Sequence, residues 1–372
     1  MFVNGKFYTG RKVEHQVLFG VDYCRVHVTD AIGNTWGEKK FGLFLANPQY
    51  YVNPDSLKNL QIAPPNVLGL GWTTLYLQDQ IKFSGKLALT VACHISRSYV
   101  NWEDPDVPDY QRHTKYSRFT PRVGLTWLFS DVLSAYALYD QSYWPQFAKN
   151  FEHKPFQPLT GYIIETGMKG YFFKRKLGVN LSLFDVVKNN TATADPLHNE
   201  YYIQTGQIKS KGIDVDITGN ITQALLVNAN YEYADAKITK DSDPGNVGLK
   251  NFGTPDHCIN FWVKYNLMKG LLKNVSFAMG YQYMGKRSAA WNWSPGDEIK
   301  SLPVYNLIDA AISYRTEKFS ISLNVYNITN MQYATFGYFN SATNEWRYTP
   351  GEPANFRISA GFNLLHKKKV SS

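Results

Sequence analysis

Aromatic side chains in the connections between the expected strands are the residues best suited to hold a large ligand. Tryptophan, tyrosine and phenylalanine rings can pack on a bulky, partly apolar molecule, while nearby polar groups bond its rim. The candidate ligand contacts are Trp36, Tyr50, Tyr51, Tyr143, Trp144, Trp291, Trp293, Phe336, Tyr338, Trp346 and Tyr348. Packing of the connections on one another is the alternative interpretation for each ring.

Residues that would support catalysis or a resident metal do not occur at useful spacing. The 8 histidines show no H-x-x-x-H pattern, and the 3 cysteines show no C-x-x-C pattern. No nucleophile motif and no phosphate-binding loop are present. A divalent cation could bind an acidic stretch, although a solvated loop is the simpler interpretation: Glu103, Asp104, Asp106 and Asp109. We therefore predict a protein that is not an enzyme and that has no catalytic residues, no metal site and no cofactor.

Strict alternation of apolar and polar residues predicts the elements that position these rings. It is clearest over 177–183, 213–217, 275–283, 319–325 and 356–364. A period of two places one set of side chains on each face of a β-strand. The polar set includes Asn, Asp, Gln and Ser, which a dry core could not satisfy. One face must therefore meet an apolar medium and the other a wet or polar-packed interior.

The connections distinguish a membrane barrel from a soluble β-sandwich. Tight turns are expected near 84–85, 130–131, 174–175, 219–222, 268–273 and 316–317, and long polar loops at 29–69, 102–116, 146–160, 190–199, 239–255, 287–302 and 334–354. Strict alternation of short and long connections is typical of transmembrane up-and-down barrels, whereas a Greek-key sandwich would mix them. With a mean hydropathy of -0.34 and no long apolar run, the chain is not a helical membrane protein. We predict an all-β, antiparallel transmembrane β-barrel with about 14 strands.

An ordered set of short stretches carries a family resemblance. They include Phe44–Tyr50, Leu77–Phe83, Pro121–Trp127, Tyr139–Tyr143, Glu165–Gly170, Lys209–Asp216, Asn324–Tyr333 and Pro350–Pro353. In this order and spacing the chain resembles the barrel of TonB-dependent siderophore receptors, of the ferrichrome or hydroxamate type. Each stretch alone is weak, but together they cover nearly the whole chain.

The resemblance implies a ferric-siderophore receptor and importer of the Gram-negative outer membrane. Its implied partners are a ferric siderophore, the TonB–ExbB–ExbD complex, and outer-membrane lipid and lipopolysaccharide, with no nucleic acid. Iron would be carried only as substrate. Lipopolysaccharide phosphates or anionic chelates could be attracted by cations such as Arg112, Lys115 and Arg287. The open alternatives are an importer of cobalamin or oligosaccharide with the same fold, and a passive porin.

Compared with the family pattern, the chain corresponds to the C-terminal part of a barrel. Family receptors have a 22-stranded barrel and a plug domain, so the plug and the TonB box are expected to be absent here. We divide the chain into a barrel region, 1–366, and a basic tail, 367–372. Because unpaired edges cannot persist in hydrocarbon, the end strands should re-pair into a smaller barrel, or the chain should not fold independently. No energy-coupled uptake by this polypeptide alone is expected.

Overall fold

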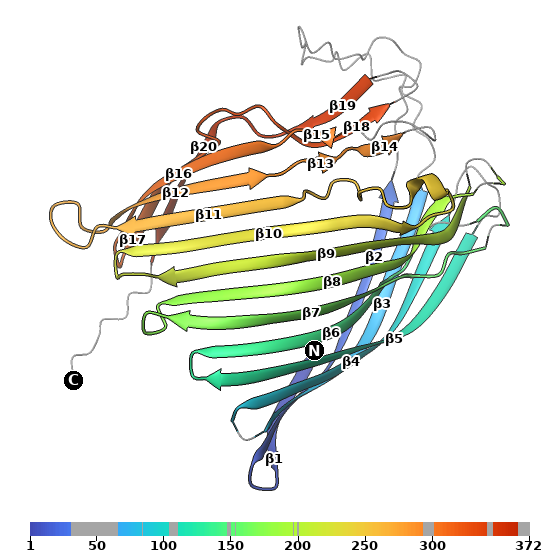
Figure 1. Cartoon of the computed structure of the whole chain (residues 1–372), viewed down its shortest axis with the longest axis horizontal. Helices are drawn as coiled ribbons and strands as arrows, with labels where there is room; N and C mark the ends of the chain where they lie inside the picture. Colours follow the sequence, from blue (N-terminus) through green and yellow to red (C-terminus); the bar gives the residue numbers. More distant parts are fainter. Residues whose placement is uncertain are drawn as a thin grey trace.

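The fold is one long, curved antiparallel sheet (Figure 1). The computed structural model describes residues 1–30, 66–83, 85–103, 111–146, 150–152, 154–195, 197–198, 201–292, 301–340 and 345–363. Within these ranges, no helix has the length and apolar character needed to cross a bilayer. The predicted basic tail at 367–372 lies outside the described residues.

The main sheet contains 15 strands, and sequence neighbours are spatial neighbours throughout. The strands are β1 (Phe2–Thr9), β2 (Val13–Asp30), β3 (Asn66–Phe83), β4 (Leu87–Glu103), β5 (Gln111–Ser130), β6 (Leu133–Trp144), β7 (Leu159–Phe172), β8 (Leu177–Ala194), β9 (Tyr202–Asn220), β10 (Leu225–Lys240), β11 (His257–Asn266), β12 (Val275–Met284), β16 (Tyr305–Arg315), β17 (Phe319–Tyr326) and β20 (Asn355–Phe362). This order confirms the up-and-down topology. The sequence had missed β1, which precedes the first expected strand.

Short turns and long connections lie at opposite ends of the sheet, as the sequence predicted. In Figure 1 the tight turns follow the left and lower edges of the sheet, and the opposite strand ends lie towards the right. The turns fall where expected; for example, β7 ends at Phe172 and β8 begins at Leu177. The intervening Phe173, Lys174 and Arg175 all have positive φ, at 51°, 57° and 66°. We call the two ends the turn end and the loop end.

The two faces of the sheet differ as the alternation predicted. Large apolar side chains on one face are well exposed, among them Phe19, Leu77, Ile95, Phe119, Leu125, Met168, Leu183, Phe277, Met279, Ile321 and Phe356. Opposed pairs such as Leu181 with Met168 and Phe277 with Ile312 keep this face apolar from strand to strand. Next to the turns, Trp127, Phe129 and Phe172 are about half exposed, as expected of an interfacial aromatic girdle. Such a face suits contact with hydrocarbon.

The last two long connections contain strands of their own, contrary to the sequence interpretation of them as loops. β13 (Arg287–Ser288) pairs with β15 (Ser301–Leu302). β14 (Ala290–Asn292) runs parallel to β18 (Ala334–Asn340), which pairs with β19 (Glu345–Pro350). The β14–β18 pairing joins residues far apart in sequence, so no local pattern marks it, whereas β18 and β19 form a local hairpin within the connection. They extend the wall at the loop end (Figure 1).

The sheet is not closed into a barrel. In the described residues, β1 pairs with β2 and β20 pairs with β17, and neither has a second neighbour. Of the two outcomes expected for the end strands, re-pairing into a smaller barrel is therefore not what the described residues show, and the other, that the chain does not fold independently, stays a prediction. The curvature of the wall separates these strands instead of bringing them together (Figure 1).

Candidate functional site

A cavity of ≈ 360 Å³ lies on the polar face, towards the loop end. It is formed by the loop-end halves of β2 to β6, because Leu70 and Trp72 are near the start of β3 and Ser98 is near the end of β4. The lining residues include Asp22, Trp72, Thr74, Tyr76, His94, Ser96, Ser98, Arg122, Asp140, Tyr143 and Trp144. We call this the aromatic cavity.

Two pairs of rings shape the aromatic cavity. The Trp72 and Trp144 ring centroids are 6.4 Å apart with planes inclined by 56°. Tyr76 and His94 meet edge to face, with centroids 6.0 Å apart. A Cβ atom at Gly20 would overlap the Tyr76 ring, so glycine at this position lets the ring lie against β2. The rings therefore form a wall on which a flat or bulky apolar group can pack.

Polar groups line the same cavity. The Arg122 guanidinium donates to the Asp140 carboxylate in an ion pair. Thr74 Oγ1 and Ser96 Oγ are 2.8 Å apart, and the Tyr143 hydroxyl lies 3.5 Å from Ser98 Oγ. A large ligand that is partly apolar and carries hydrogen-bonding oxygen atoms fits this combination of charge, hydroxyl groups and rings.

Described residues of the connection after β6, which follows Trp144, are hydrogen-bonded to neighbouring strands. The Tyr116 hydroxyl donates to the Phe156 carbonyl at 2.7 Å, and Phe156 is only 3% exposed. Gln146 Nε2 donates to the carbonyls of Gln157 and Asn190, at 2.9 Å and 2.8 Å. Trp144, which is 54% exposed, ends β6 just before these residues, opposite Leu159 of β7.

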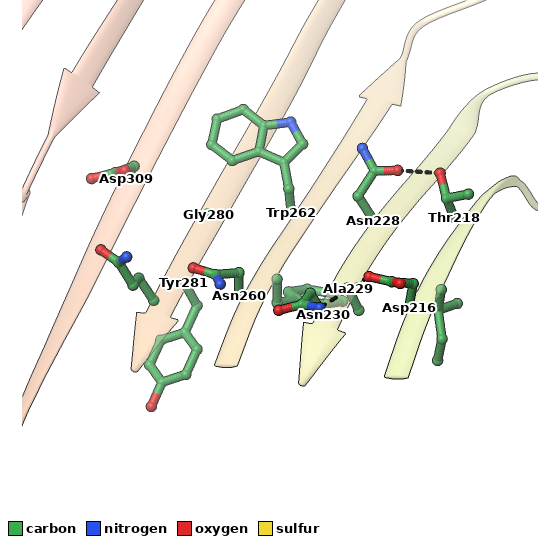
Figure 2. A pocket seen from close by; sticks show the side chains of 13 residues that line it. Asp216, Thr218, Asn228, Ala229, Asn230, Asn260, Trp262, Gly280, Tyr281 and Asp309 are labelled. Carbon is green, nitrogen blue, oxygen red and sulfur yellow. Dashed lines mark hydrogen bonds between the residues drawn. The ribbon is translucent and has the colours of Figure 1, made fainter. Parts of the chain in front are cut away.

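A second cavity, of ≈ 610 Å³, lies on the same face across β9, β10, β11, β12 and β16. Figure 2 shows its side chains in rows that cross the strands. Asn230 Nδ2 donates to Asp216 at 2.9 Å, and Thr218 Oγ1 donates to Asn228 at 2.5 Å. The Trp262 indole lies over Gly280, where an added Cβ would come within 2.6 Å of it. We call this the amide cavity, because the side-chain amides of Asn228, Asn230 and Asn260 line it together with the Trp262 indole.

The structure tests the position of only some predicted ligand contacts. Tyr143 and Trp144 line the aromatic cavity together. Trp346 and Tyr348 stack on β19 with centroids 5.2 Å apart, and Phe336 on β18 is 43% exposed. Trp36, Tyr50, Tyr51 and Trp293 lie outside the described residues. Trp291 and Tyr338 are placed by backbone register, with Ala290 opposite Tyr338 and Trp291 opposite Phe339.

Sequence reasoning missed Trp72, the principal partner of Trp144. The alternation along the strand could have identified it, because every second residue of β3 lies on the same face. Trp72 therefore shares the polar face with Thr74, Tyr76 and Gln78. It also missed a stack at the loop end, where the Phe151 and His198 centroids are 3.6 Å apart.

Arg287 was expected to attract anions at the surface, and this is wrong. Its side chain is only 4% exposed. The guanidinium donates to the Ala334 carbonyl and lies 5.2 Å from the centre of the Tyr305 ring. Arg287 therefore ties the connection after β12 to the connection after β17. Lys115, in contrast, is exposed.

In the connection after β8, Asp195 and His198 form a local ion pair. His198 Nδ1 is 3.0 Å from Asp195 Oδ2, and the backbone N–H of Leu197 donates to Asp195 Oδ1 at 2.9 Å. The hydrogen bond from His198 holds the pKa of the Asp195 carboxyl below its ordinary value. Across the part of the chain that the structure describes, no group of three or more His, Cys, Asp or Glu residues is arranged to hold a metal ion. Of the acidic stretch considered for a divalent cation, Asp104, Asp106 and Asp109 lie outside that part.

Residues 2–328 match the family model described as TonB dependent receptor-like, beta-barrel. The metal-pseudopaline receptor CntO of Pseudomonas aeruginosa strain UCBPP-PA14 is 26% identical over 372 residues, covering 96% of this chain and 50% of that protein. The ferrichrome outer membrane transporter/phage receptor of Escherichia coli K12 is 26% identical, covering 91% of this chain and 45% of that protein. The relatives are receptors and transporters.

A solved structure shows the same fold. The ferripyoverdine receptor of the Pseudomonas aeruginosa outer membrane, bound to ferripyoverdine, superposes with a TM-score of 0.73 at 22% identity. The match covers 96% of this chain and 47% of that one. The chain thus spans about half the length of the relatives that it matches.

Proposed function

The chain belongs to the TonB-dependent receptor-like β-barrel family of outer-membrane proteins, and from this premise we propose that it forms the ligand-binding wall of a receptor that imports ferric siderophores. The energy for import would come from the TonB complex of the inner membrane, as the family name implies. The imported iron is substrate, enclosed in its chelate.

The observation that carries this proposal is the aromatic cavity. It faces the interior of the curved wall at the loop end, which is the external end in bacterial barrels. Its opposed indoles and its arginine are side chains that bury well against large chelates with oxygen-rich rims. The relatives named as metal-pseudopaline and ferrichrome receptors support a metal chelate as the ligand class.

Truncation of the two indoles tests the proposal. Trp72→Ala and Trp144→Ala should each weaken binding of the recognised chelate about tenfold, since a buried aromatic contact contributes roughly 1–2 kcal/mol. The measurement is binding of radiolabelled iron by outer membranes that contain the protein, with the iron offered as ferrichrome, ferrioxamine B, pyoverdine or pseudopaline. The host strain should lack its other receptors for these chelates.

Trp262→Ala is the matched control, because it removes an indole from the amide cavity on the same face. It should leave chelate binding within about twofold, since Trp262 does not line the aromatic cavity. The amount of folded protein in the outer membrane is measured for every variant. If the protein binds none of these chelates, or if both cavity variants bind as the native protein does, the proposal is wrong.

A further inference from the structure

Cations gather at the turn end of the sheet. Lys174, Arg175 and Lys176 form the β7–β8 turn, and Lys269 and Lys273 lie in the β11–β12 turn. Arg315 and Lys318 flank the β16–β17 turn. At this end, the Glu14 carboxylate forms ion pairs with Lys6 and Lys82 on β1 and β3. The surface at this end is strongly basic.

The β11–β12 turn is unusual because its tip is apolar. Leu271 is 103% exposed, and Leu272 and Met268 are about half exposed. This turn reaches further out than its neighbours (Figure 1). It is nevertheless well ordered, because the backbone N–H groups of Asn274 and Lys273 donate to Leu267 and Gly270 at 3.0 Å and 3.2 Å.

A groove separates this turn from the β16–β17 turn beside it. Its volume is ≈ 720 Å³, and Lys273, Arg315 and Lys318 all line it. The backbone N–H of Arg315 donates to the Asn274 carbonyl at 3.1 Å, which fixes the two turns to each other. The groove is therefore a concavity between two linked turns, and its walls carry three cations and one carboxylate, Glu317, so that the cations are in excess.

The groove is continuous with the apolar outer face. Phe319 lines it, and the Phe319 ring lies 5.6 Å from Tyr314 and 6.5 Å from Phe362, centroid to centroid. Aromatic rings of this kind lie at the headgroup level of a bilayer. The three cations are consequently at the depth where lipid phosphates are found.

We infer that the β11–β12 and β16–β17 turns form a binding site for an anionic phospholipid of the membrane leaflet at the turn end. The lipid phosphate lies between Lys273, Arg315 and Lys318, which match its charge.

Lipid retention by the purified receptor tests this site. The protein in nonionic detergent is incubated with phosphatidylglycerol or phosphatidylcholine, and bound lipid is counted by native mass spectrometry. We expect clear preference for phosphatidylglycerol, declining as salt rises. The triple variant Lys273→Gln, Arg315→Gln, Lys318→Gln should lose at least tenfold in phosphatidylglycerol affinity, since each cation near an anionic headgroup contributes about fivefold.

Two further variants test whether the groove itself holds the lipid. Lys115→Gln, Lys240→Gln, Lys286→Gln removes the same charge from exposed residues at the loop end and should retain phosphatidylglycerol as the native protein does. Leu271→Gln with Leu272→Gln changes the tip of the β11–β12 turn, which does not line the groove, and should also retain phosphatidylglycerol as the native protein does. Heat-modifiable mobility on electrophoresis confirms that each variant is folded.

Four results would overturn the site. They are equal retention of the two lipids by the native protein, equal losses in the two triple variants, the same loss in the double leucine variant as in the Lys273, Arg315 and Lys318 triple variant, and displacement of lipid by inorganic phosphate at millimolar concentration. The last result would identify a free-anion site. Binding of an acidic protein to the turns without lipid preference would likewise assign the surface to a protein partner.

Discussion

The two faces of the same strands present opposite chemistry, and β12 shows this within ten residues. On its outer face, Phe277 and Met279 are 47% and 51% exposed. On its inner face, Ser276 is buried and donates to Asn266 at 2.7 Å, and Gln282 lines the amide cavity. Exposed apolar groups next to satisfied polar groups indicate that lipid lies outside and a polar interior lies inside.

The inner face is a connected hydrogen-bond network as well as a polar surface. Asn230 Nδ2 donates to Asp214 and Asp216 at 2.8 Å and 2.9 Å. The Tyr136 hydroxyl donates to Glu165 at 2.5 Å. Moving polar and charged groups of this kind from water into hydrocarbon would cost several kcal/mol. Free energy therefore favours lipid at the apolar outer face and disfavours lipid at the polar inner face.

A charge placed on the outer face should break this contrast most strongly. Met279→Arg is expected to destabilise the protein in lipid vesicles by about 2–4 kcal/mol, the cost of arginine near the bilayer midplane. The free energy of unfolding is measured by denaturant titration in vesicles. Gln282→Arg is the matched control, because it places the same charge on the inner face of the same strand, near Asp216 and Asp309. Equal losses of unfolding free energy in the two variants would contradict the assignment of Met279 to the lipid-facing side and Gln282 to the interior side of β12.

Crowding on the inner face should have the next largest effect. Gly280→Ala would bring a methyl group within 2.6 Å of the Trp262 ring, and overpacking of this kind costs about 1–3 kcal/mol. The same substitution in a Trp262→Ala background should cost much less, because the ring is gone. Both free energies of unfolding are measured in vesicles. Identical costs in the two backgrounds would show that the indole does not lie over Gly280.

The smallest effect is expected in the connection after β8, which lies outside the strands and belongs to neither face of the sheet. Asp195 has a pKa below its ordinary value because His198 bonds its charged form. Its ion pair therefore stabilises the loop above the ordinary carboxyl pKa, and this stabilisation is lost as the pH falls through the lowered pKa. His198→Gln should move the Asp195 titration back towards its ordinary value. Carboxyl NMR of selectively labelled protein measures this titration, and an unchanged midpoint would contradict the pairing.

Prediction from sequence succeeded where the pattern was local. A period-two alternation needs only neighbouring residues, so strands such as β8, β12 and β17 were found together with their faces. The turns between them were found because short polar segments interrupt that alternation. The strand β1 escaped, because its eight residues lie at an edge and are exposed on both sides.

The candidate site was only partly predictable. Tyr143 and Trp144 stood out as adjacent rings at the end of a strand. Trp72 did not stand out, because it lies 72 positions before Trp144 and meets it only after β3 and β6 are brought together in the curved wall. Arg287 was misread as a surface cation, since its burial depends on the Ala334 carbonyl and the Tyr305 ring, which belong to distant segments.

The amino-acid sequence by itself determined which side of each strand meets lipid and where the chain reverses, because both depend on residues within one or two strand lengths. Tertiary structure alone decided which rings share a cavity, which charge is buried, and that the two basic turns flank one groove. These outcomes depend on the register and curvature of many strands, and contacts between distant residues leave no periodic trace in the chain.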